Sequence, residues 1–178
     1  MIDLIKEESD IEFQNWSSSK LVDYIVERHH RYVDEHLPII LHFASKVVKK
    51  YSRSIPMTIE LYELITMLAD DLSHHMQKEE SVLFPMICNH SDYISNSNSF
   101  RDPLSTMEVE HEEAIEIYKR IKKLTNNYQL PKGVCSLFET LYMHLQEFEA
   151  DLHLHIHLEN NVLFPKVKGL AIRMAELG

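Results

Sequence analysis

Apolar residues recur three and four positions apart along most of this chain, with polar residues between them, which predicts amphipathic α-helices. The 178 residues include only 3 Gly and 6 Pro, a composition that favours long helices joined by short turns over a sheet with many tight turns. Long amphipathic helices with short links are typical of an all-α, up-down-up-down four-helix bundle. The predicted helices span residues 19–51, 57–88, 103–127 and 131–165.

Serine and proline residues indicate where these helices begin and bend. Ser17 and the two serines after it are candidates for the N-cap of the first helix. Pro56 and Pro131 suit the first turn of a helix, whereas Pro38 lies inside the first helix and should kink it. Gly169 should break the chain after the last helix. We therefore expect an N-terminal arm, one bundle domain, a polar loop within it and a C-terminal tail, spanning residues 1–18, 19–168, 89–100 and 169–178, respectively.

One fifteen-residue pattern occurs twice, and the second copy begins 80 positions after the first. Each copy places a His and a Glu four residues apart, on one face of a helix. The other two helices also match, because each contains a Glu-x-x-His step and the two steps are 81 positions apart. The bundle is therefore expected to be a duplicated helical hairpin with a pseudo-twofold axis. The matched segments are Asp71-Leu72-x-x-His75-x-x-x-Glu79-x-x-Val82-Leu83-Phe84-Pro85 with Asp151-Leu152-x-x-His155-x-x-x-Glu159-x-x-Val162-Leu163-Phe164-Pro165, and Glu27-x-x-His30 with Glu108-x-x-His111.

The repeated His and Glu positions predict a metal site in the core of the bundle. Two carboxylates can bridge two cations, and two neutral imidazoles can bind each cation. Mixed imidazole and carboxylate ligation suits iron or manganese better than calcium, which prefers oxygen ligands, or structural zinc, which often takes thiolates. Six side chains do not complete two six-coordinate ions, so open positions remain for a small molecule. The predicted ligands are His30, His75, Glu79, His111, His155 and Glu159.

Other interpretations of these residues exist. A single His-x-x-x-Glu step is usually a solvated pair on a helix surface. Ferritin-like di-metal sites use two Glu-x-x-His steps and two further Glu, which here would recruit Glu27 and Glu108. That assignment leaves His75 and His155 without a role at equivalent positions, so we prefer the four-His set. The Val-Leu-Phe-Pro tails are expected to pack in the core and to stop each helix.

The acidic and imidazole side chains near the predicted ligands have less definite roles. Asp71 and Asp151 lie one turn before a ligand His, where each is either an acceptor for an imidazole N–H or a solvated acid. Glu80 is turned about 100° from Glu79 and should face solvent. The other histidines, including the His153-x-x-x-His157 pair, are expected on exposed or half-exposed faces. The rest of this set is His29, His36, His42, His74, His90 and His144.

Charge and composition exclude several classes of protein. The formal net charge of −10 gives no basic surface for nucleic acid. No window of about 18 apolar residues exists, so no membrane span is expected. The acidic N-terminal segment does not resemble a signal peptide, which favours a cytoplasmic protein. Cys88 and Cys135 form no C-x-x-C pair and are expected to be reduced, partly buried thiols.

The segments that carry the predicted ligands resemble the hemerythrin-like domain of the RIC proteins, the iron–sulfur cluster repair di-iron proteins. The resemblance covers residues 20–166 and implies a non-haem, oxo-bridged di-iron centre at the same six positions, with manganese or zinc as substitute metals. Members of the family also carry a small N-terminal domain with a cysteine pair, whereas residues 1–18 contain no Cys. The matching segments are Tyr24-Ile-Val-Glu-Arg-His-His30, His75-Met-Gln-Lys-Glu79-Glu80-x-x-Leu-Phe-Pro85, Met107-Glu-x-Glu-His111, Lys122-Lys-Leu-Thr-Asn-Asn127, Pro131-x-x-x-Cys135 and His155-Ile-x-Leu-Glu159-Asn-Asn-Val-Leu-Phe-Pro165.

This resemblance implies a stress-response protein that repairs iron–sulfur clusters damaged by nitric oxide or peroxide, with damaged iron–sulfur proteins as partners and iron supply as the mechanism. The alternatives are an enzyme that reduces nitric oxide or peroxide at the open metal positions, or an oxygen carrier or sensor of the hemerythrin type. Oxygen-carrying hemerythrins resemble this pattern but use an H-x-x-x-H step and an Asp bridge, whereas both steps here run from His to Glu. That difference favours a more open and reactive centre. No separate catalytic side chain is predicted, and the sequence is compatible with a monomer or a dimer.

Overall fold

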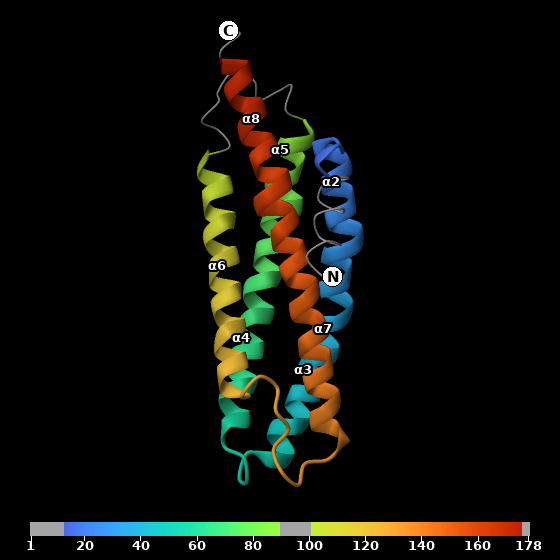
Figure 1. The fold of residues 1–178 in the computed structure, drawn as a ribbon, viewed down its shortest axis with the longest axis vertical. Coiled ribbons are helices and arrows are strands. Elements are labelled where there is room, and N and C mark those ends of the chain that lie inside the picture. The colour runs from blue at the N-terminus through green and yellow to red at the C-terminus, as the bar shows by residue number, and fades with distance from the viewer. Residues whose placement is uncertain (1–12, 90–100, 176–178) are drawn as a thin grey trace.

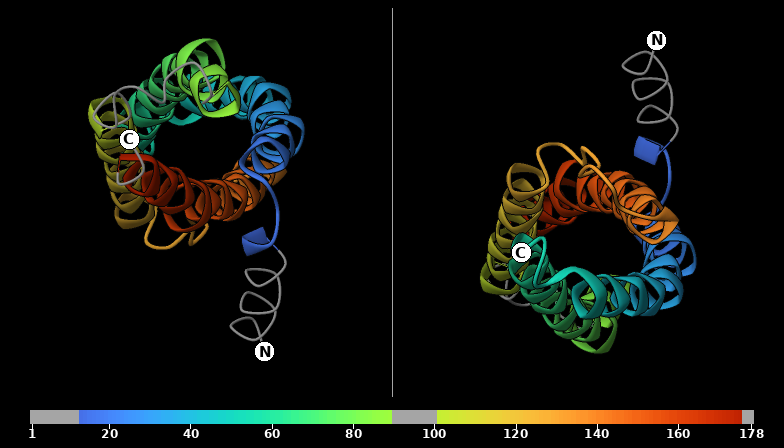
Figure 2. Two further views of the ribbon diagram at one scale, coloured as in Figure 1. Left: turned by 90° about the horizontal axis from the view of Figure 1, so that it is seen from above. Right: turned by 90° about the horizontal axis from the view of Figure 1, so that it is seen from below.

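The computed structural model describes residues 13–89 and 101–175, and these residues form an antiparallel bundle of four long helices (Figures 1 and 2). This confirms the predicted all-α architecture. Seen along its axis, the bundle places the first helix beside the second and the fourth, and the third beside the second (Figure 2). The first long helix consists of α2 (Ser18–Ile25), η1 (Val26–His30) and α3 (Arg31–Tyr51), and the second of α4 (Met57–Lys78), η2 (Glu79–Leu83) and α5 (Phe84–Cys88). The third is α6 (Arg101–Leu124). The fourth consists of α7 (Ser136–Leu158), η4 (Glu159–Leu163) and α8 (Phe164–Ala175).

The N-terminus of the first helix follows from its serine. The Ser17 side chain accepts a hydrogen bond from the Lys20 backbone N–H at 3.2 Å, as an N-cap residue does. Before it, Phe13 and Trp16 pack against Tyr24, which ties this part of the predicted arm to α2. Pro38 lies within α3, and the helix continues beyond it to Tyr51.

Each of the three segments η1, η2 and η4 is a single π-helical turn inside a longer helix, a feature that the sequence did not predict. In η2 and η4 the backbone N–H of Phe84 or Phe164 donates to the carbonyl of Glu79 or Glu159, five residues back. A π turn is frequent at functional sites because it inserts one residue and re-aims the side chains around it. The two turns begin at the two predicted carboxylate ligands, which supports the pseudo-twofold duplication.

The prediction that Pro85 and Pro165 stop their helices is wrong. The chain continues as a helix to Cys88 after Pro85 and to Ala175 after Pro165, passing through Gly169, where we expected a break. The π turn supplies the physical reason, because it places each proline in the first turn of a new α-helical segment, where its missing N–H costs little. Gly169 costs only about 1 kcal/mol relative to Ala within a helix, so it does not end one alone.

Two predicted helix ends are also wrong by several residues. The third helix ends at Leu124, because residues 126–128 adopt positive φ angles of 50°, 56° and 59°. The fourth begins at Ser136 instead of residue 131, since Gly133 has a φ angle of +77° and Cys135 is extended. Asn accommodates the left-handed region better than most residues, which explains why the third helix stops where it does.

Two apolar cores fill the bundle. The larger core occupies the end near the α3–α4 turn and includes Phe138, Tyr142 and Phe148, while the smaller core at the opposite end includes Phe84 and Phe164. None of the helices in the described ranges is both long and apolar enough to cross a lipid bilayer. Cys88 and Cys135 are both exposed free thiols, so the expectation that they are partly buried is wrong.

Replacing Phe148 by Ala should destabilise the fold strongly. Phe148 is 1 % exposed and lies between Tyr32 and Tyr118, with ring centres 6.0 and 6.4 Å away. The cavity should lower the free energy of unfolding by about 3–5 kcal/mol, measured by urea denaturation of the metal-free protein. Met143→Ala on the same helix is the control, because Met143 is 50 % exposed, and it should change this free energy by no more than about 0.5 kcal/mol. Equal effects of the two substitutions would contradict the assignment of the larger core.

Candidate metal centre

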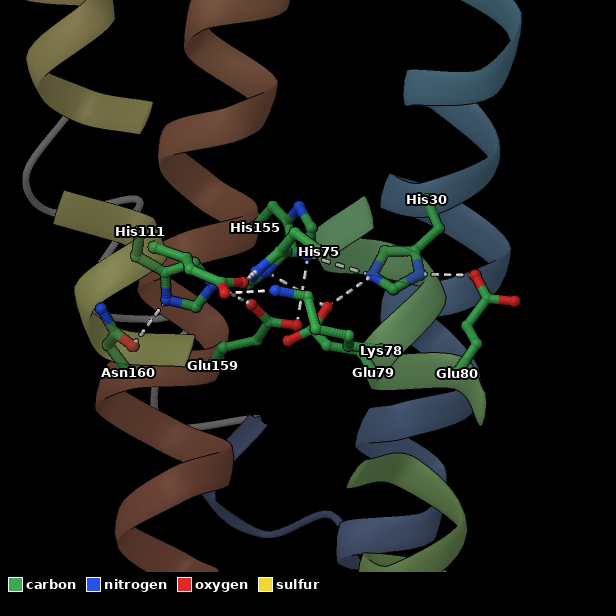
Figure 3. A network of polar contacts seen from close by, with 10 residues as sticks. His30, His75, Lys78, Glu79, Glu80, His111, His155, Glu159 and Asn160 are labelled. Atoms are coloured by element: carbon green, nitrogen blue, oxygen red, sulfur yellow. Dashed lines mark hydrogen bonds and ion pairs between the residues drawn. The ribbon is translucent and has the colours of Figure 1, made fainter. Parts of the chain in front are cut away.

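The six predicted ligands lie together between the two apolar cores, with their side chains pointing toward one another (Figure 3). Four helices contribute one imidazole each, and the second and fourth helices add the carboxylates. The most exposed of the six, His75, is only 3 % exposed. The structure brings together the six residues that the sequence pattern selected, and their role as metal ligands stays a prediction; they are His30, His75, Glu79, His111, His155 and Glu159.

The six side chains form two overlapping groups that share both carboxylates. His30 and His155 belong to one group and His75 and His111 to the other, and in each group the ligand atoms lie within 4.8 Å of one another. The Nε2 atoms of His30 and His155 are 3.2 Å apart, and those of His111 and His75 are 3.0 Å apart. This buried His and Glu cluster is able to bind metal, and its two-fold grouping fits two cations bridged by two carboxylates.

The carboxylates are the strongest indication of a cation. Glu79 and Glu159 are 0 % exposed, and both oxygens of Glu79 and Oε2 of Glu159 have no hydrogen-bond partner among the described residues. Imidazole nitrogens approach them at 3.0–3.4 Å, but the geometry does not make hydrogen bonds to these oxygens. Burying a carboxylate without a counter-charge costs several kcal/mol, so the arrangement fits a bound cation better than an empty protein core.

The two carboxylates set the charge of the imidazoles around them. Burial opposes the charged form of His30, but the adjacent Glu79 carboxylate, the charge of Glu159 and the hydrogen bond to Glu80 raise its pKa to about 9. Burial likewise opposes protonation of His111, but the adjacent Glu159 carboxylate and the charge of Glu79 nevertheless raise its pKa to about 8. Burial would raise the pKa of Glu159, yet the adjacent His155 and His111 hold it well below its usual range. Protons therefore occupy part of the site when no metal does.

Three of the four ligand imidazoles are oriented by an acceptor on a neighbouring helix. The Nδ1–H groups of His30, His75 and His111 donate to Glu80, Glu110 and Asn160 at 2.7, 2.9 and 2.9 Å, respectively. Such acceptors fix the tautomer and leave Nε2 free to bind metal. The Glu80 side chain faces solvent as expected, being 47 % exposed, and it also accepts this bond from His30, which the sequence did not indicate.

The sequence pattern did not indicate Glu110 and Asn160 as acceptors for the imidazoles. It contained one signal for Asn160, because Glu80 and Asn160 each directly follow a predicted carboxylate ligand and are 80 positions apart. The repeat also accounts for two phenyl rings, those of Phe84 and Phe164, at equivalent positions beside imidazoles of the cluster. Phe84 stacks on His30 with centres 5.6 Å apart, and Phe164 stacks on His111 at 6.0 Å.

One side of the centre adjoins a cavity of about 220 Å³ between α4 and α6. Lys78 donates to Glu110 there, and the hydrogen bonds from Lys78 and His75 lower the pKa of Glu110 although its partial burial acts in the opposite direction. The sequence made Asp71 a candidate acceptor for a ring N–H of His75. In the structure Glu110 accepts that hydrogen bond, and Asp71 is exposed at the cavity. The cavity gives small molecules or ions an approach to His75 and His111.

The structure does not support the ferritin-like assignment. The Glu27 side chain is 64 % exposed and pairs with Arg31 at 2.7 Å. Glu108 pairs with Lys168 at 2.6 Å, at the protein surface. Both Glu side chains thus lie outside the buried cluster, whereas His75 and His155, which that assignment left without a role, lie inside it.

Most of the other histidines lie where we expected them, with one exception. His42, His74 and His153 are exposed, while His36, His144 and His157 are half-buried; His90 lies outside the described residues. His29 is 0 % exposed, so its predicted surface position is wrong. Its Nδ1–H donates a hydrogen bond to Asp151 at 3.0 Å. Asp151 is therefore the acceptor for His29 and not for His155, one of the six residues of the cluster.

Known proteins resemble this chain over most of its length. Residues 21–167 match the hemerythrin HHE cation binding domain. The chain is 38 % identical over 156 residues to the iron–sulfur cluster repair protein YtfE of Musicola paradisiaca, an alignment that covers 86 % of this chain and 68 % of that protein. The proteins of the same name from Escherichia coli and Escherichia fergusonii are also 38 % identical over 156 residues, covering 86 % of this chain and 69 % of each relative.

Replacing Glu79 by Leu should abolish binding of two metal ions per chain. The substitution removes a carboxylate that both groups share, while Leu suits the buried position and keeps the helix. Iron and zinc content should be measured after loading and desalting, together with the helical circular dichroism signal. Glu27→Leu and Glu108→Leu are the controls, and each should still bind two ions. Two tightly bound ions in Glu79→Leu would show that this carboxylate is not a bridge.

The metal-free protein should lose stability, and bind metal more tightly, as the pH rises from 6.5 to 9. His30 and His111 have pKa values of about 9 and 8 in the fold and an ordinary value of 6.5 when unfolded. Their contribution to stability is therefore complete below pH 6.5 and is lost as the pH passes 8 and 9. Metal must displace the same protons, so its apparent affinity should increase over this range. Thermal unfolding and competition with a chelator measure the two effects.

This pH experiment needs a background without Cys135. The Tyr51 hydrogen bond, a backbone N–H and Lys50 lower the pKa of this exposed thiol to about 7, which gives stability a dependence of opposite sign between pH 7 and 9. The substitution Cys135→Ser removes that contribution. The metal-loaded protein is the control, because metal replaces the protons and its stability should not fall over the same range. Equal slopes with and without metal would contradict the proton assignment.

Proposed function

This chain belongs to the hemerythrin HHE cation-binding family and to the YtfE-type iron–sulfur cluster repair proteins, and we propose that it repairs damaged iron–sulfur clusters with iron from its buried centre. The observation that carries this proposal is the pair of fully buried carboxylates between two pairs of imidazoles, with three of their four oxygens lacking a hydrogen-bond partner among the described residues. A damaged iron–sulfur protein is then the target.

The donor set supports iron as the resident metal. The cluster contains four imidazoles and two carboxylates, and no thiolate joins it among the described residues. Calcium and magnesium prefer oxygen ligands, whereas imidazole with carboxylate suits iron in non-haem sites. In this proposal His30 and His155 would hold one ion, His75 and His111 would hold the other, and both ions would share Glu79 and Glu159. Bound iron would supply both the ions for a damaged cluster and a redox couple that changes how tightly they are held.

The protein side chains would control iron release through protons. His30 and His111, with pKa values of about 9 and 8, take up protons near neutral pH whenever a ligand bond opens. A proton on Nε2 blocks the lone pair that binds metal, so protonation favours departure of the ion. Glu80, Glu110 and Asn160 keep the other ring nitrogen protonated and the ring aimed inward during this exchange. The centre therefore suits a labile store better than a permanent structural site.

A second candidate function is the reduction of nitric oxide or peroxide at the same centre. The cavity of about 220 Å³ beside His75 and His111 favours it, because a small molecule can approach the buried cluster there. The two functions differ in their stoichiometry. Repair consumes iron from the protein, whereas an enzyme turns over many substrate molecules and keeps its iron.

The repair function is tested with a [4Fe–4S] hydro-lyase inactivated by nitric oxide. Iron-loaded wild-type protein should restore its activity faster than an equal amount of free ferrous iron, with loss of iron from the protein. Glu159→Leu should lose this effect, because the shared carboxylate is gone, while His42→Ala, an exposed His on α3, should retain it. Catalytic nitrous oxide production without recovery of the hydro-lyase would favour the second candidate and contradict repair.

A further inference from the structure

His29 lies beside the metal centre, although neither of the two ligand groups contains it. Its ring is completely buried and nearly parallel to the ring of the ligand His155, with an angle of 7° and centres 5.6 Å apart. Tyr24 covers the other side, edge-on at 5.7 Å, and Trp16 packs on Tyr24 at 5.4 Å. The aromatic cover keeps this imidazole away from water, and a buried polar ring normally has a specific partner.

The pseudo-twofold repeat shows which position His29 occupies. His29 precedes the ligand His30 as Glu110 precedes the ligand His111, at the same spacing of 81 residues. Glu110 accepts the Nδ1–H of His75, and the repeat equivalent of His75 is His155. By this symmetry His29 lies beside His155 in the position that Glu110, the hydrogen-bond acceptor, occupies beside His75.

His29 and His155 carry complementary nitrogens that lack partners. The Asp151 carboxylate can only accept, so Nδ1 of His29 carries a proton, and in the ring with a single proton the lone pair lies on Nε2. His155 directs Nε2 toward the cluster, 3.2 Å from Glu159, so its Nδ1 carries the proton when Nε2 binds metal. Both His29 Nε2 and His155 Nδ1 are buried without a hydrogen-bond partner in the described part of the chain. One bond between them would satisfy both atoms.

We propose that His29, held by Asp151, is the positioning residue for His155 in the metal-loaded protein. The Nδ1–H of His155 donates to Nε2 of His29, and this bond fixes the ring that binds one of the two ions. The inference rests on the proposed two-metal centre but not on the repair of clusters. His29 itself binds no metal.

This assignment gives the two metal positions matched surroundings. Behind His30 and His155 lie the Glu80 carboxylate and the imidazole of His29. Behind His75 and His111 lie the Glu110 carboxylate and the neutral Asn160 amide. Each ion would thus have one carboxylate acceptor behind its imidazoles and one acceptor of another kind, His29 in one half and Asn160 in the other.

The test compares His29→Phe with His29→Gln. Phe keeps a buried aromatic ring but removes the acceptor, while Gln removes the ring but offers a neutral carbonyl oxygen. Release of ferrous iron to a chelator should be about tenfold faster or more in His29→Phe than in wild type, and His29→Gln should recover most of this loss. His42→Phe is the matched control, since His42 is an exposed His on α3. Its release rate should equal that of wild type.

A spectroscopic measurement separates positioning from packing. Proton NMR of the iron-loaded protein should show shifted, exchangeable N–H signals of the bound imidazoles, and in His29→Phe one of them should exchange faster with water. Helix content and the thermal midpoint of the metal-free variants verify the fold. An unchanged release rate and an unchanged N–H signal in folded His29→Phe would overturn the role of His29. Failure of wild-type protein to bind iron would instead overturn the centre itself.

Discussion

Two carboxylates buried in an apolar bundle are the constraint on which the rest of the structure depends. Glu79 and Glu159 are 0 % exposed, and most of their oxygens have no hydrogen-bond donor in the described residues. Their charge must be compensated nearby, because isolated charges in a protein interior are too costly to retain. Protonated His30 and His111 compensate this charge without metal, and two bound cations would compensate it in the proposed centre. Metal would then replace protons at the site, and the reverse exchange would accompany the proposed release of iron.

The duplicated hairpin explains how one short sequence builds this site. In each copy a His and a Glu share a helix face, the Glu begins a π turn, and the Phe five residues later stacks on an imidazole from another helix. The same π turn allows the following Pro to remain inside a continuous helix. Each Val-Leu-Phe-Pro tail is therefore a packing element that positions a ligand of the neighbouring helix, and not a signal to stop.

The centre is symmetric in its ligands but not in the side chains behind them. Glu80 and Asn160 occupy equivalent positions of the repeat, and so do His29 and Glu110. One half opens to the cavity between α4 and α6, where Lys78 and Glu110 lie, while the other half is covered by His29, Tyr24 and Trp16. In the proposed centre the two positions would therefore differ in access, because one adjoins the cavity and the other lies behind aromatic rings.

The sequence by itself determined the four helices and all six residues of the cluster. A His and a Glu four positions apart must share a helix face, and the offsets of 80 and 81 residues select the matching positions on other helices. Those inferences rely on periodicity within a helix, which the sequence specifies directly. The chain alone did not reveal the π turns, because a Pro that stops a helix and a Pro that follows a π turn have the same sequence context.

Only the tertiary structure decided which neighbours orient the ligands. Glu80, Glu110 and Asn160 reach imidazoles on other helices, and His29 turns inward although three of its helix neighbours, Glu27, Arg28 and Arg31, are exposed. These contacts depend on the rotation of each helix about its axis and on its distance from the next helix. Both quantities result from how the two apolar cores pack, so no spacing along the chain encodes them directly.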